Sequence, residues 1–192
     1  MMAASSPIRI GQVSDGFPYY VHLMGEKLFW AMFDDPNVIK VSDADHFAAA
    51  LREASVEAEP SLKVAYDKAT QKYVNDYQQV LWAVADHSSL RRQMKEIYGS
   101  YQRIMAESPG FRGELPMDTK TFYNRMNALR GETHGRIIRS TGAGWYEFRE
   151  NRLRGYVRLV AEREGVELEP EHHLGAKLAN PLLRWQQHQL RC

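Results

Sequence analysis

The stretch TKTFYNRMNALRGETHGRIIRSTGAGWYEFR, residues 119–149, changes its hydrophobic period along its length. In the first part apolar residues recur every three or four positions, which predicts an amphipathic helix that begins after Asp118 and ends near Gly131. Two short runs rich in β-branched and aromatic residues, 136–140 and 145–149, then flank the turn Thr-Gly-Ala-Gly. Such runs around a glycine-rich turn predict a β-hairpin.

Upstream of this stretch the spacing of apolar residues predicts one long helix from Pro60 to about Ala85 and another, capped by Ser88 or Ser89, that ends before Pro109. The order of three helices and a hairpin is that of a winged helix, a helix-turn-helix variant in which the hairpin forms the wing. The helix over 119–130 takes the position of the recognition helix. A last amphipathic helix follows the hairpin.

The N-terminal part of the sequence predicts three shorter helices, separated by Gly16, by the aspartates and proline around residue 35, and by Pro60. Gly16 can take the left-handed conformation, with positive φ, that stops a helix. We therefore expect a mainly α protein in three parts: a helical subdomain over residues 1–59, a winged-helix domain over 60–165, and a C-terminal tail over 166–192. The apolar spacing in the tail is compatible with a helix.

The composition is that of an ordinary globular protein, with 44% hydrophobic and 26% charged residues in 192. No segment approaches the roughly 20 apolar residues that a membrane span needs, so we expect no membrane partner. The N-terminus shows neither the basic nor the apolar region of a signal peptide. The single cysteine, Cys192, favours a reducing, cytoplasmic setting.

Positive charge gathers in the middle of the chain. Residues 1–90 carry 7 Lys/Arg against 12 Asp/Glu, whereas residues 91–158 carry 14 against 7, which indicates an anionic partner. If that partner is DNA, the predicted contacts lie on the 119–130 helix and the hairpin: Lys120, Asn124, Arg125, Arg136, Arg139, Trp145 and Arg149. Arg152, Arg154 and Arg158 would extend this basic face. The alternatives are a solvated surface or a surface that docks onto another domain.

No catalytic site is predicted. The segment from Gly11 to Gly16 has the G-x-x-x-x-G spacing of a phosphate-binding loop, but Phe17 and Pro18 stand where that loop needs Lys and Ser/Thr. The adjacent histidines His172 and His173 lack the spacing of metal ligands. The sequence lacks both the Walker A phosphate-binding loop and the Walker B acidic residues that hold Mg²⁺, so we expect that the chain alone is no enzyme. We also expect that it holds no cofactor or metal.

Five segments carry a resemblance to a known family: SDGFPYYVHL (14–23), YDKATQKY (66–73), FYNRMNALRGETHGRIIRS (122–140), GWYEFRENRLRGYVRL (144–159) and EREGVEL (162–168). Together they resemble the C-terminal half of bacterial P-loop ATPases of the AAA+/STAND type. In that superfamily a helical lid follows the nucleotide-binding core, and a winged helix follows the lid. The resemblance spans most of residues 8–168.

The resemblance implies a role for Gly16, Phe17 and Pro18, which match the Gly-x-Pro turn that lies beside the adenine and ribose in such ATPases. ATP or ADP with Mg²⁺ would bind only together with the core, which this sequence lacks. Many AAA+ relatives add a sensor arginine on the following helix. Here no Arg or Lys appears before Lys27, which fits the STAND variant better.

The first functional hypothesis is a regulatory lid and winged-helix module, non-catalytic alone, that works with a P-loop ATPase core in cis or in trans and relays the nucleotide state to a partner. The first alternative is a stand-alone winged-helix DNA-binding protein. The second is a homo-oligomeric interaction module that uses aromatic helix faces and residues 182–185.

Overall fold

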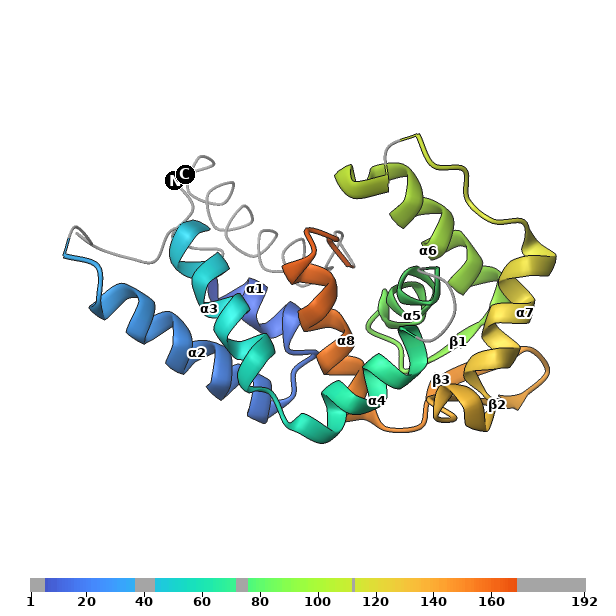
Figure 1. The fold of residues 1–192 in the computed structure, drawn as a ribbon, viewed down its shortest axis with the longest axis horizontal. Helices are drawn as coiled ribbons and strands as arrows, with labels where there is room; N and C mark the ends of the chain where they lie inside the picture. Colours follow the sequence, from blue (N-terminus) through green and yellow to red (C-terminus); the bar gives the residue numbers. More distant parts are fainter. Residues whose placement is uncertain (1–5, 37–43, 72–75, 112, 169–192) are drawn as a thin grey trace, which may run out of the picture.

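The computed structural model describes residues 6–36, 44–71, 76–111 and 113–168 (Figure 1). Within these ranges the chain is mainly helical, as predicted, with a small antiparallel sheet. The helices are α1 (Ser6–Val13), α2 (Pro18–Phe33), α3 (Ala44–Glu57), α4 (Pro60–Thr70), α5 (Tyr77–Ala85), α6 (Met94–Glu107), α7 (Thr119–Leu129) and α8 (Asn151–Arg163). The strands are β1 (Arg91–Gln93), β2 (Ile138–Gly142) and β3 (Trp145–Phe148), and two 3₁₀ turns cover Pro109–Phe111 and Glu132–His134.

The sheet has the order β1-β3-β2, with both pairs antiparallel. The hairpin of β2 and β3 confirms the prediction from the sequence. Its turn needs backbone conformations that favour glycine, because Gly142, Ala143 and Gly144 all have positive φ, of 103°, 46° and 78°. β1 was not predicted. It pairs with the other edge of β3, so that Arg92 lies opposite Tyr146.

Helix α5 lies at the centre of the C-terminal part, with nearly every side chain buried. Helices α6, α7 and α8 pack around it. The prediction of one helix from residue 60 to 85 is wrong, because α4 ends at Thr70 and α5 begins anew at Tyr77 in another direction (Figure 1). The apolar residues of α4 face α8, whereas those of α5 cover its whole circumference. One straight helix could not present both surfaces to the core.

Helix α8 connects the two ends of the chain. It contacts α1 and α3 on one side and α4 and α5 on another, and in Figure 1 it lies between the N-terminal helices and the sheet. The buried apolar side chains form one continuous cluster across these contacts. The domain boundaries at residues 59 and 165 stay predictions, and most of the tail over 166–192 lies outside the described residues.

Candidate functional site

The corner between α1 and α2 is built by the backbone. Asp15 and Gly16 both have positive φ, of 54° and 70°, as predicted for Gly16. The Gly16 N–H donates to the Gly11 carbonyl at 3.1 Å and the Asp15 N–H to the Gln12 carbonyl at 3.2 Å, the pattern that closes many helices at a left-handed residue. Pro18 then begins α2 at the position where a missing N–H costs nothing.

Phe17, between these two elements, packs half-buried against the core. Gly16 and Pro18 are exposed, and a Cβ added at Gly16 would meet no atom within 4 Å. The corner therefore presents a small open backbone surface beside the start of α2.

The corner is fastened to α8 by buried polar contacts. One Asp15 carboxylate oxygen lies 3.2 Å from Arg154 Nη2 and 3.9 Å from Arg158 Nη1. Both arginines are almost fully buried, with 1% and 3% of their surface exposed. The Tyr20 hydroxyl, at the start of α2, donates to the Arg152 carbonyl at 2.9 Å. Burial raises the pKa of the Tyr20 phenol well above its usual value, so this hydroxyl stays protonated and can donate.

Helices α2 and α8 also approach closely at one glycine. A Cβ built on Gly155 would lie 2.6 Å from a ring carbon of Tyr20, a distance that side chains do not tolerate. Any other residue at this position would push the two helices apart. The contact between the corner and α8 therefore depends on both charge and shape.

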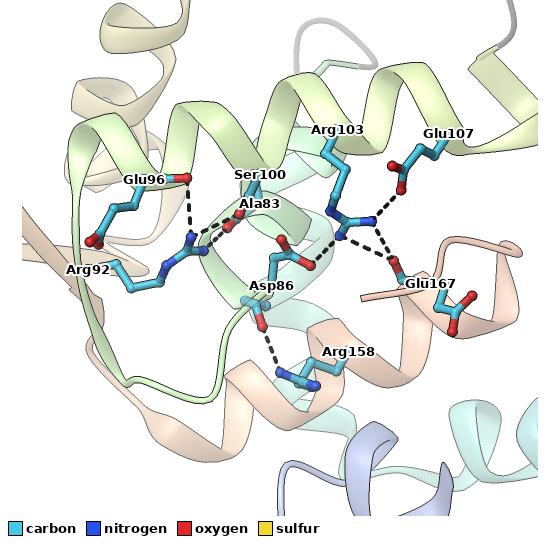
Figure 2. A network of polar contacts seen from close by, with 10 residues as sticks. Ala83, Asp86, Arg92, Glu96, Ser100, Arg103, Glu107, Arg158 and Glu167 are labelled. Carbon is cyan, nitrogen blue, oxygen red and sulfur yellow. Dashed lines mark hydrogen bonds and ion pairs between the residues drawn. The ribbon is translucent and has the colours of Figure 1, made fainter. Parts of the chain in front are cut away.

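Three buried arginines, Arg92, Arg154 and Arg158, meet at the C-terminal end of α5, and we call this group the arginine cap. Arg92 Nη1 donates to the Ala83 carbonyl and Arg158 Nη1 to the Ala85 carbonyl, both at 2.9 Å, as drawn in Figure 2. Arg154 donates to the carbonyls of the loop that follows α5. The last carbonyls of a helix have no partner within it and carry its negative dipole end, so cations stabilise them.

A fourth arginine extends the network towards the surface. Arg103 Nη2 lies 2.5 Å from an Asp86 carboxylate oxygen, and Nη1 lies 2.9 Å from Glu107, as Figure 2 shows. Arg103 also reaches the Glu167 carbonyl, after α8. All these contacts stabilise helix ends and join α5, α6 and α8. We therefore regard the network as structural, and the prediction that Arg154 and Arg158 belong to an exposed basic face is wrong.

Helix α7 begins at the predicted cap. The Asp118 carboxylate accepts hydrogen bonds from the backbone N–H groups of Lys120 and Thr121, and the Thr121 hydroxyl donates to it at 2.7 Å. These bonds lower the pKa of Asp118, with the Thr121 hydroxyl making the largest contribution. Lys120 and Asn124, two of the predicted DNA contacts, are exposed on α7.

Three of the predicted DNA-contacting arginines have carboxylate partners within the chain. Arg125 Nε lies 2.8 Å from Asp76, and its guanidinium covers the ring of Tyr77. Arg139 Nε lies 2.6 Å from Glu147, its neighbour across the hairpin, and Arg136 pairs with Glu132. Trp145 is half-buried, with the Arg91 guanidinium over its ring. The structure thus leaves less uncompensated charge on α7 and the β2–β3 hairpin than the sequence predicts.

A polar depression of about 380 Å³ lies between the end of α7 and the hairpin. It brings together Arg139 and Arg149, which were predicted, with Asn127, Arg130 and Ser140, which were not, and we call these five residues the wing groove. Asn127 Oδ1 accepts a hydrogen bond from Arg130 Nη1 at 2.9 Å. Arg130 follows the last apolar residue of α7. No pattern in the sequence predicts that this residue lies beside the hairpin.

An exposed aromatic patch lies at the C-terminal end of α2. Phe29, Trp30 and Phe33 are 59%, 47% and 69% exposed, and their ring centroids lie 5.4 to 6.1 Å apart. The sequence did not predict this patch. Contiguous exposed apolar surface of this kind is typical of a contact with another protein or domain.

The described residues contain no group of three or more His, Cys, Asp and Glu side chains placed to hold a metal ion. His172, His173 and Cys192, and the predicted interaction segment 182–185, lie outside these residues. Within the same described ranges, no helix has both the length and the apolar character needed to cross a bilayer.

Neither a protein-family model, nor a curated protein, nor a solved structure matches this chain. The resemblance to AAA+/STAND-type ATPases thus stays a prediction.

Proposed function

We propose that the chain is the lid and winged-helix region of an AAA+/STAND-type ATPase, a non-catalytic module that passes nucleotide state from the lid corner to the winged helix. The order α5-β1-α6-α7-β2-β3, with β3 in the middle of the sheet, supports a winged helix. Helices α1 to α3 precede it, where this superfamily has its lid.

The observation that carries the proposal is the attachment of the corner to α8. A relay needs an element that both sites can bias, and the buried contact between the corner and α8 is our candidate for that element. The Asp15 carboxylate lies beside Arg154 and Arg158, and Gly155 admits the Tyr20 ring. If nucleotide moves Gly16 to Pro18, we expect α8 to move with them.

The aromatic patch on α2 supports a second part of the proposal. In an isolated module Phe29, Trp30 and Phe33 stand in water. A P-loop core, in cis or in trans, would cover such a surface, and covering large aromatic side chains stabilises an association.

The test uses the P-loop protein encoded in the same reading frame or beside it. We expect this core to bind a fluorescent ADP analogue more tightly when the chain is added, by about 5- to 150-fold, the usual range of coupling between sites. Gly16→Asn should abolish the gain, because Asn tolerates a positive φ but fills the open space beside the backbone.

Gly25→Ala is the matched control, since Gly25 lies within α2 with no atom within 4 Å of an added Cβ. It should keep the full effect. The proposal is wrong if no P-loop core accompanies the chain, or if the chain leaves the nucleotide affinity of that core unchanged.

A further inference from the structure

Two arginines of the wing groove differ from the other predicted cations of this face. Arg125, Arg136 and Arg139 are neutralised by carboxylates. Among the described residues, no carboxylate lies within ion-pair distance of Arg130 or Arg149, and the Arg130 guanidinium donates a hydrogen bond to the neutral amide of Asn127. The groove therefore has positive charge available for a ligand.

These two side chains line the depression from two different elements of the fold. Arg130 follows Leu129, the buried last residue of α7. Arg149 follows Phe148, the buried last residue of β3, and its N–H donates to the Ile137 carbonyl at 2.9 Å, which continues the hairpin pairing by one residue. Because strand side chains alternate, Arg149 lies on the exposed face with Glu147 and Arg139.

We propose that the wing groove binds backbone phosphates of duplex DNA. Its donors are guanidinium groups, a side-chain amide and a hydroxyl, the groups that make most protein contacts to phosphate oxygens. Arginine is suited to this role because its planar fork can bind two phosphate oxygens at once.

The rest of α7 favours a polymer over a small phosphate. Lys120, Asn124 and Asn127 recur at spacings of four and three residues, so they follow one line along the helix towards the groove. Lys120 and Asn124 are exposed along this line. A duplex can contact the groove and this line together, whereas a single phosphate would contact the groove alone.

The test is fluorescence anisotropy of a labelled duplex of about 20 base pairs with the full chain, over about 25 to 200 mM salt. The logarithm of the binding constant should fall linearly with the logarithm of the salt concentration, by about 0.9 for each phosphate neutralised. The double variant Arg130→Gln/Arg149→Gln should make this slope shallower by about 1.8, and each single variant by about 0.9. Melting curves identify any variant that fails to fold. If one of the two single variants does not fold, the slope is compared for the other single variant.

The matched control is Arg52→Gln/Lys63→Gln, which removes two exposed cations from α3 and α4. It should keep the slope of the unchanged protein. The proposal is wrong if the duplex does not bind at the lowest salt, or if the control variant lowers the slope as much as the groove variant does.

A second experiment distinguishes the phosphates of a DNA backbone from free phosphate. Inorganic phosphate is titrated into the protein alone, and binding is followed by the NMR chemical shifts of Arg130 and Arg149. Binding of inorganic phosphate without binding of the duplex would overturn the proposal in favour of a small-anion site. No P-loop core enters either measurement, so this test and that of the ATPase-module proposal can fail independently.

Discussion

The arginine cap and the wing groove use the same side chain in opposite environments. Arg92, Arg154 and Arg158 are at most 6% exposed, and their guanidinium groups bind carbonyls at the end of α5 and in the loop that follows it. Arg130 and Arg149 are exposed on a polar depression. A buried guanidinium is retained where backbone groups need donors, whereas an exposed one without a carboxylate partner is available to a ligand. The role of an arginine thus depends on what the fold leaves unpaired around it.

The largest effect is expected from the arginine cap. Arg154→Met removes one of the two guanidiniums beside the Asp15 carboxylate and a donor to the loop after α5, so it should lower the free energy of unfolding by about 3–5 kcal/mol. Urea denaturation measures this. Combining it with Asp15→Asn should recover part of the loss, because the buried carboxylate is then neutral. A loss no greater than that of Arg149→Met would break the comparison between the two groups.

A smaller effect on stability is expected at Gly155, where α8 packs against Tyr20 of α2. Gly155→Ala places a methyl group against the Tyr20 ring and should cost about 1–3 kcal/mol in unfolding free energy, as overpacking usually does. Gly99→Ala, in α6 with open space around it, is the control and should stabilise the protein by up to about 1 kcal/mol. If both substitutions shift the thermal midpoint in the same direction, the close contact is not what constrains position 155.

On the exposed side, acid should weaken the start of α7. The pKa of Asp118 is lowered in the folded protein, so its contribution to stability is present above the unfolded pKa of about 3.9 and is lost as the pH falls through the folded pKa. Asp118→Ala should therefore lower the free energy of unfolding at pH 7, although by less than Arg154→Met or Gly155→Ala does. This difference between the variant and the unchanged protein should become smaller in acid. Asp118→Asn keeps a capping side chain that does not titrate. If the difference in unfolding free energy between Asp118→Ala and the unchanged protein does not depend on pH, the capping role is contradicted.

The smallest effect on stability is expected from the wing groove. Arg130→Gln and Arg149→Gln should each change the unfolding free energy by no more than about 0.5 kcal/mol, as surface substitutions usually do, while weakening the binding of duplex DNA. Thermal melting and anisotropy on the same preparations measure the two quantities. Destabilisation as large as that of Arg154→Met would mean that the groove arginines are structural as well.

Local patterns in the sequence were sufficient for the elements that neighbouring residues specify. The cap at Asp118, the positive φ of Gly16 and the hairpin around residues 141–144 were predicted correctly, because each depends on the chemistry of a few adjacent residues. β1 was missed, because three residues are too short to show an alternation and the strand forms only where the edge of β3 accepts it. The break between α4 and α5 was missed because the apolar period continues across it.

The sequence by itself determined that this is a mainly helical chain with one hairpin, since hydrophobic period and turn residues act over short distances. Only the tertiary structure decided which cations face inwards. Arg154 and Arg158, four residues apart, have the spacing of a solvated helix stripe, yet they lie against the end of α5 and the carboxylate of Asp15. The unpaired carbonyls that attract them come from a distant part of the chain, so no local pattern could reveal their partners.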